Sequence, residues 1–196
     1  MDITILINKD HKLDKNYVPM NLIVADENEN NFHNFVDPNM KTMIDKNVFF
    51  YFKKMQEDAL KNNINIIIDS GYRSYDYQQT VWDNYLEEYG LEETKKRVAP
   101  PGASEHQSGL AFDIGYIING EFVEDITDEQ IETKWLFANA HKYGYIIRYP
   151  KGKEDITGYM YEPWHYRYVG IELASYLYEN NLTLEEYYLE KKPKKI

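Results

Sequence analysis

The apolar runs of this chain are short, and runs typical of strands and of helices follow one another in no regular order. Ile64–Gly71, INIIIDSG, is a β-branched run that predicts a buried strand. Lys46–Lys61 instead repeats its apolar residues at helical spacing, with charges between them. A doubly wound α/β fold needs strands and helices in regular alternation. The sequence therefore predicts an α+β fold in which helices flank a small, mainly antiparallel sheet.

Capping and turn residues place the other elements. Ser or Thr followed three positions later by Glu or Gln is typical of a helix start, and glycine often ends a helix. The helices predicted in this way are Tyr75–Tyr89 between Ser74 and Gly90, a helix from Thr127 and Gln130 to about Tyr143 that ends at Gly144, and a last helix opened by Thr183 and Glu186. The further predicted strands are Gly109–Gly115, Glu121–Val123 across the Asn119–Gly120 turn, YIIRYP at 145–150 and WHYRYVG at 164–170.

No repeat or linker divides the chain, so residues 1–196 are predicted to form one domain. Residues 1–40 are rich in Asn, Asp and Pro and lack periodicity, which predicts a loop-rich N-terminal arm. The basic tail 191–196, KKPKKI, is expected to be a solvated end. The turn-rich segment Arg97–Glu105, RVAPPGASE, is predicted to be a loop.

Charge and composition exclude several classes of function. A net charge of −11 disfavours nucleic acids and anionic membranes as partners. The absence of cysteine excludes disulfides, thiolate ligands and a Cys nucleophile, so a metal would need His, Asp and Glu. The first residues do not resemble a signal peptide, and no apolar run is long enough for a membrane span. We expect a cytoplasmic protein, although an envelope protein whose leader had been removed would look the same. The oligomeric state is not readable.

Two of the five histidines stand in positions suited to chemistry. His11 and His33 lie in the polar arm and His141 lies late in a helix, so these three are expected at the surface. His106 precedes a strand that carries Asp113, and His165 begins another strand. Two His and one Asp can bind zinc and leave a fourth position open for water. Spacing alone does not separate this hypothesis from hydrogen-bonded core residues.

Three more residues are candidates for the same site. Glu162, expected on a turn because Pro163 follows it, is positioned to take a proton from water or to be a surface charge. Arg73, in SGYRSYDYQQ, follows a buried strand and could hold a substrate carboxylate or a developing oxyanion, or pair with surface acids. Ser104 could donate a hydrogen bond, or act as a nucleophile with His106 as its base.

Taken together, these segments resemble one family. SGYRSYDYQQ, SEHQSGLAFDI, YGYIIRYPKGKEDITGYMYEPWHYRYVG and LTLEEY are similar to the VanY-type zinc D-alanyl-D-alanine carboxypeptidases, which include VanXY enzymes and peptidoglycan L,D-carboxypeptidases. The resemblance extends from Leu6 to Tyr187. It implies the α+β fold shared by VanX and the hedgehog signalling domain.

The resemblance also implies a role for each site residue. It places one zinc ion per chain on His106, Asp113 and His165, the catalytic carboxylate on Glu162 and the cation that holds the tetrahedral intermediate on Arg73, with substrate contacts from Gln78 and Ser104. The implied activity is removal of the C-terminal D-Ala from peptidoglycan precursor or stem peptides by a D,D-carboxypeptidase or D,D-dipeptidase, as in VanXY-type glycopeptide resistance. The alternatives are an L,D-carboxypeptidase acting on tetrapeptide stems, a minor endopeptidase activity and, outside the enzymes, a binding module with structural zinc.

Overall fold

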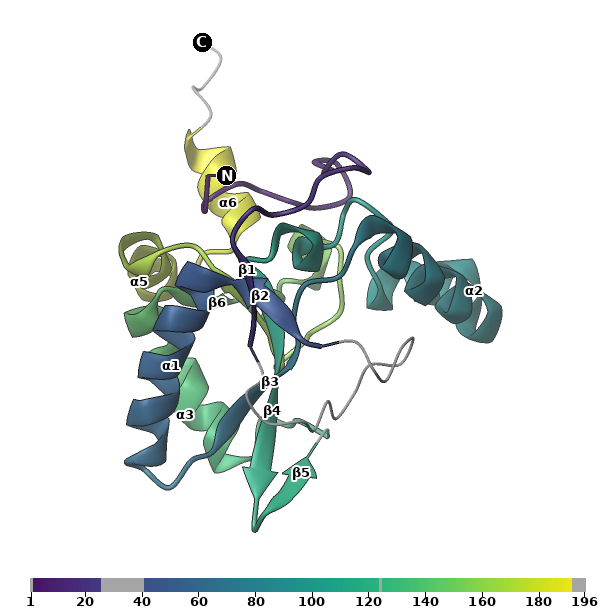
Figure 1. Ribbon diagram of the computed structural model, residues 1–196. Coiled ribbons are helices and arrows are strands. Elements are labelled where there is room, and N and C mark those ends of the chain that lie inside the picture. The colour runs from purple at the N-terminus through teal and green to yellow at the C-terminus, as the bar shows by residue number, and fades with distance from the viewer. Residues whose placement is uncertain (1, 26–40, 124, 192–196) are drawn as a thin grey trace.

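The predicted α+β fold is confirmed: helices flank an antiparallel five-stranded sheet (Figure 1). The computed structural model describes residues 2–25, 41–123 and 125–191. His33, residues 26–40 of the expected arm and residues 192–196 of the expected tail lie outside the described residues. In the described part, no helix is both long and apolar enough to cross a membrane.

The central sheet has the order β3-β4-β7-β6, and β5 extends it by pairing with β4. Every pairing is antiparallel. The strands are β3 (Ile66–Ser70), β4 (Ala111–Ile118), β5 (Glu121–Val123), β6 (Tyr145–Ile147) and β7 (His165–Tyr168). The hairpin between β4 and β5 turns at Asn119 and Gly120, both with positive φ, as the sequence predicted.

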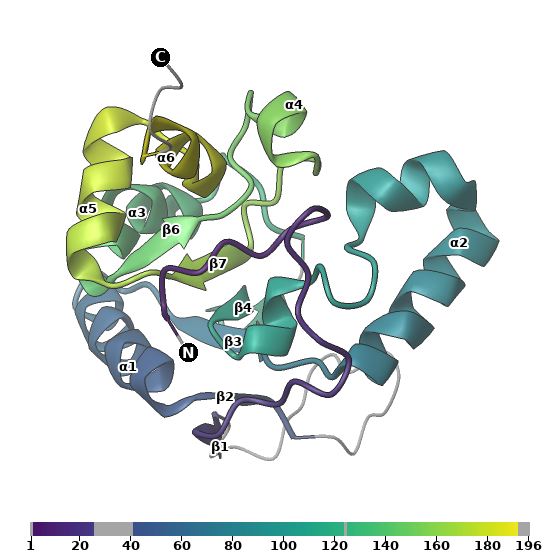
Figure 2. The ribbon, with the colours of Figure 1, turned by 90° about the horizontal axis from the view of Figure 1, so that it is seen from above.

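The helices fall into two groups. α1 (Lys46–Leu60), α3 (Ile131–Asn139) and α5 (Ile171–Asn180) pack around the short 3-10 helix η2 (Ala140–Tyr143). α2 (Tyr75–Arg97) lies apart from them, on the other side of the sheet (Figure 2). The remaining helical segments are the 3-10 helix η1 (Glu105–Ser108), α4 (Glu154–Thr157) and α6 (Leu184–Lys191).

Some predicted boundaries were wrong. The backbone is non-helical at Gly90, where the sequence predicted a helix end, but a second helical segment that was not predicted follows directly and extends α2 to Arg97. α3 begins at Ile131 rather than beside Thr127, and of that capping box the Thr127 N–H donates to the Gln130 side-chain oxygen. At α6 both halves of the box form, with Thr183 N–H bonding Glu186 and Glu186 N–H bonding the Thr183 hydroxyl.

Alternation along β4 and β7 gives the sheet two different faces. Successive side chains of a strand point to opposite faces. One face carries Phe112, Ile114 and Tyr116 of β4 with Tyr166 and Tyr168 of β7, and it packs on α1 in the main hydrophobic core. Phe112 makes edge-to-face contacts with Phe52 of α1 and with Tyr145. The opposite face, termed the polar face, carries the intervening residues, among them Asp113 of β4 and His165 and Arg167 of β7.

In the view of Figure 2 the described part of the N-terminal arm passes over β7, and Arg167 of this strand donates to the Ile3 and Ile5 carbonyls of the arm. Its residues Leu22–Val24 form a strand, β1, that pairs with β2 (Met43–Asp45) in a separate two-stranded sheet. Neither strand was predicted from the sequence, because the composition of these segments is typical of loops. Farther back in the arm, Leu13 N–H bonds the Gly102 carbonyl, and Lys9 Nζ donates to the Lys95 and Gly158 carbonyls. The arm is thus attached to the loop before η1 and to the end of α2.

Candidate active site

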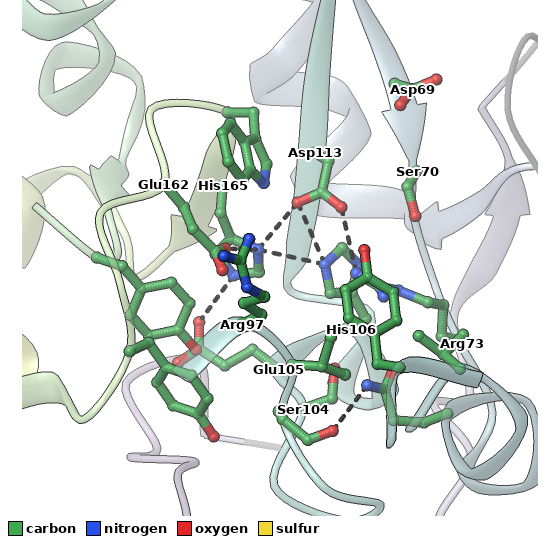
Figure 3. A pocket seen from close by; sticks show the side chains of 18 of the residues that line it. Asp69, Ser70, Arg73, Arg97, Ser104, Glu105, His106, Asp113, Glu162 and His165 are labelled. Carbon is green, nitrogen blue, oxygen red and sulfur yellow. Dashed lines mark hydrogen bonds and ion pairs between the residues drawn. The ribbon is translucent and has the colours of Figure 1, made fainter. Parts of the chain in front are cut away.

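Three side chains converge on the polar face of the sheet. His106 Nε2 lies 3.2 Å from His165 Nδ1, and Asp113 Oδ1 lies 3.4 Å from the first of these atoms and 3.0 Å from the second. Both imidazoles are almost fully buried. Figure 3 shows the Asp113 carboxylate directed toward the two rings. The structure therefore brings together the three ligands that the sequence predicted.

This triangle fits a metal ion. Zinc binds His nitrogen and carboxylate oxygen at about 2.0–2.2 Å, and tetrahedral angles then place the ligand atoms about 3.3 Å apart. The three observed separations agree with that spacing, and the group is one that could hold a metal. His106 Nδ1 lies 2.6 Å from the carbonyl oxygen of Gly71. Since a carbonyl only accepts, Nδ1 carries the ring proton and Nε2 offers its lone pair to the centre of the triangle.

Strand register and two glycines position the ligands. Asp113 of β4 stands directly opposite His165 of β7, so their side chains share a face at close range. His106 reaches the same point from η1, and the chain returns to β4 through Gly109, whose positive φ favours glycine. Gly71 permits the approach of β2, because a Cβ there would lie 2.2 Å from the Met43 carbonyl oxygen.

Glu162 lies beside the triangle, as predicted, just before the turn that leads into β7. Its Oε2 is 3.9 Å from His165 Nδ1, and the side chain is 11% exposed. Burial raises the pKa of Glu162 to about 8. A carboxylate with so high a proton affinity suits a group that takes a proton from water and returns it to a leaving group.

Arg73 closes the other side of the site (Figure 3). Its Nη2 lies 3.2 Å from Asp113 Oδ2, so Asp113 shares its two oxygens between the cation and the histidines. Burial alone would raise the pKa of Asp113, but His106, His165 and Arg73 hold it well below its usual range. The Arg73 Nε is buried and has no hydrogen-bond partner among the described residues. One donor of this guanidinium is thus left for a ligand.

The site opens into a cleft of about 670 Å³ between the sheet and α2. Gln78 and Ser104 line this cleft, where the sequence predicted substrate contacts. Gln78 donates from Nε2 to the Ala99 carbonyl at 2.8 Å, and its buried Oε1 has no partner in the described part of the chain. The alternative of a Ser104 nucleophile is disfavoured, because both His106 ring nitrogens are already engaged by Gly71 and by the ligand triangle.

Sequence reasoning missed the buried ionic groups beneath the site. Glu105, Arg148 and Arg167 are almost completely buried, and both arginines donate hydrogen bonds to Glu105. No spacing pattern distinguishes Arg148 and Arg167 from ordinary strand residues; the only available signal for Glu105 was its position next to His106. His141, expected at the surface, is half-buried and stacks on Tyr178 with ring centroids 3.8 Å apart. His11 is exposed, as expected.

Comparison with known proteins agrees with this geometry. Residues 41–171 match the family described as VanY: D-alanyl-D-alanine carboxypeptidase. The chain is 44% identical to the putative carboxypeptidase YodJ of Bacillus subtilis over 195 residues, which is 100% of this chain and 69% of that protein. The structure of the LD-carboxypeptidase LdcB superposes with a TM-score of 0.83 at 43% identity, over 99% of this chain and 88% of that one.

A further solved structure is that of the D,D-pentapeptidase VanY from a VanB-type vancomycin resistance cassette, as a variant in complex with Zn(II). It superposes with a TM-score of 0.75 at 33% identity, and the match covers 96% of this chain and 99% of that chain. The likeness thus extends well beyond residues 41–171 and includes the segments that carry every ligand of the triangle.

Metal binding at this site should release protons. Burial would lower the pKa of His165, but the carboxylates of Asp113 and Glu105 beside its two ring nitrogens outweigh it and raise this pKa to about 9, whereas burial and Arg73 lower that of His106 to about 4. Between about pH 5 and 8 a cation must therefore displace a proton from His165. Zinc affinity should weaken at least tenfold per unit of acidification, with at least one proton released per ion.

Calorimetry of zinc binding in buffers of different ionisation enthalpy measures that proton count directly. A heat that does not change with the buffer, together with an affinity that does not change between pH 6 and 8, would contradict this assignment of His165.

Proposed function

The chain belongs to the VanY family of D-alanyl-D-alanine carboxypeptidases, and on that premise we propose that it is a zinc-dependent carboxypeptidase that removes the C-terminal D-Ala from peptidoglycan precursor or stem peptides. The observation that carries this proposal is the triangle of His106, Asp113 and His165, with Glu162 beside it, at the floor of a cleft. One zinc ion per chain would be held by the triangle.

A bound zinc ion supplies Lewis acidity, polarising the scissile carbonyl and making water nucleophilic at neutral pH. Glu162 accepts the proton of the attacking water and passes it to the nitrogen of the leaving D-Ala. Its buried position keeps its proton affinity near that required for both transfers. Arg73 places a cation beside the same centre, where its unpartnered Nε–H can bond the oxygen that becomes negative.

The substrate carboxylate is assigned to the polar groups that line the cleft. Ser104 is a hydroxyl donor, Gln78 turns an amide into the cleft, and Arg73 supplies positive charge. The cleft volume of about 670 Å³ falls in the range that holds ligands larger than a dipeptide. A cleft of this size admits a longer stem peptide as well as a dipeptide. The open cleft and Glu162 oppose a binding module with structural zinc, because such a site needs neither an open side nor a base.

A second candidate is an L,D-carboxypeptidase that acts on tetrapeptide stems. The specific observation in its favour is that identity to the LD-carboxypeptidase LdcB is 43%, against 33% to the D,D-pentapeptidase VanY. The two candidates share the ligand triangle and Glu162. They differ in the stereochemistry of the residue before the terminal D-Ala, and hence in the cleft contacts of that residue.

Replacing the proposed base should abolish turnover and leave the metal in place. In Glu162→Gln the amide cannot accept the water proton, so kcat for D-Ala release should fall by about 10²–10⁴-fold. Zinc content and melting temperature should stay close to those of the unchanged protein. Glu172→Gln, at an exposed glutamate of α5, is the matched control and should keep full activity. Substantial residual turnover in zinc-loaded Glu162→Gln would refute this role.

Release of D-Ala from three substrates tests the proposed specificity. A pentapeptide stem ending in D-Ala-D-Ala and a tetrapeptide stem ending in a single D-Ala are compared with the free dipeptide D-Ala-D-Ala, each with the zinc-loaded enzyme. We expect the pentapeptide to have the highest kcat/KM and the dipeptide the lowest. Preference for the tetrapeptide would establish the second candidate in place of the first, and cleavage of none of them would contradict both.

A further inference from the structure

Glu105 is a buried carboxylate at the start of η1, directly before His106. Its side chain is fully buried. Oε1 accepts two hydrogen bonds, from Arg148 Nε at 2.8 Å and from Arg167 Nη1 at 2.7 Å. Both cations are therefore bonded through one oxygen, and the lone pairs of Oε2 remain available to another donor.

The second oxygen of Glu105, Oε2, faces His165, which is one of the proposed metal ligands. Glu105 Oε2 lies 3.5 Å from His165 Nε2 (Figure 3). Both atoms are buried, and neither has a hydrogen-bond partner among the described residues, so each is the nearest candidate partner of the other. The opposite ring nitrogen of His165, Nδ1, faces Asp113 and His106. The imidazole therefore stands between two carboxylates, one on the metal side and one behind it.

The groups behind Glu105 hold it in a fixed position. Arg148 makes a bidentate pair with Glu185 of α6, at 2.8 Å and 2.6 Å. Arg167 Nη2 donates to the carbonyls of Ile3 and Ile5 in the N-terminal arm, at 3.0 Å and 2.8 Å. The two cations and two anions balance in charge. Such a charge-balanced, hydrogen-bonded cluster keeps a buried carboxylate ionised and restricts its rotamers.

From this arrangement we propose that Glu105 is a positioning residue for the metal site: it accepts the Nε2–H of His165 and so directs the Nδ1 lone pair of that ring toward His106 and Asp113. The inference rests on the metal site of the proposed function and deepens it. A ligating His commonly donates its other N–H to a carboxylate, which fixes the tautomer and strengthens the metal bond. The cluster also connects the site to α6 and to the N-terminal arm.

The competing explanation is that Glu105 only neutralises the two arginines. Glu105→Gln separates the two roles. The amide keeps the shape of the side chain and can still accept from the arginines through its oxygen, but it then presents N–H to the N–H of His165. We expect zinc affinity, measured by chelator competition, to fall about 10–100-fold. Glu105→Asp, which retains the charge, should recover part of this loss.

Glu185→Gln is the matched control, because it weakens the same arginine cluster on the side away from the metal. It should lower the melting temperature and leave zinc affinity within about twofold of the unchanged protein, whereas Glu105→Gln should lower both. Substitution of Co²⁺ adds a spectroscopic test: the visible absorption should shift in the Glu105→Gln variant and not in Glu185→Gln. Equal zinc affinities and Co²⁺ spectra for Glu105→Gln and the unchanged protein would overturn the proposal.

Two further measurements apply if Glu105→Gln does not fold. The variant Glu105→Gln/Arg167→Gln restores charge balance and should show the same loss of affinity. In the zinc-loaded unchanged protein, ¹⁵N spectra of His165 should show a protonated Nε2 and a metal-bound Nδ1. The reverse assignment, or an unprotonated Nε2, would refute the role of Glu105. Failure of the unchanged protein to bind zinc would instead refute the proposed function.

Discussion

The candidate site depends on the antiparallel pairing of β4 with β7. This register sets Asp113 opposite His165, and alternation along the two strands then places both side chains on the face away from the hydrophobic core. A slip of one residue would turn the acid and the imidazole into the apolar core and expose Phe112 and Tyr166. The burial of aromatic residues on one face is therefore what holds the two candidate metal ligands together on the other.

The polar face contains several buried charges, and each is compensated locally. Asp113 divides its oxygens between Arg73 and the two histidines, and Glu105 divides its own between two arginines and His165. Since an uncompensated buried charge would cost several kcal/mol, these pairings keep the site ionised without unfolding it. The acidic surface of the protein has little part in this. The local arrangement of cations decides which carboxylates carry charge and which, like Glu162, retain a proton.

The residues of the candidate site were predicted from the sequence, whereas the buried charged residues around them were not. His106, Asp113, His165, Glu162 and Arg73 were all predicted, since the resemblance covers the segments that carry them, and the structure places them together. The fold class followed from the irregular order of short apolar runs. Glu105, Arg148 and Arg167 could not be predicted, because the partner of each lies 37 to 62 residues away and is chosen by tertiary packing. The same holds for β1 and β2, whose pairing joins a loop-like arm to the domain.

The central claim is that the side chains of His106, Asp113 and His165 form one metal site. Diffraction from crystals of the zinc-loaded protein, with data on both sides of the zinc absorption edge, tests it most directly. The account predicts one anomalous peak per chain, bonded to His106 Nε2, Asp113 Oδ1 and His165 Nδ1, with an open side toward Glu162 and the cleft. A zinc ion bound elsewhere, or an intact hydrogen-bonded triangle without a peak at saturating zinc, would contradict it.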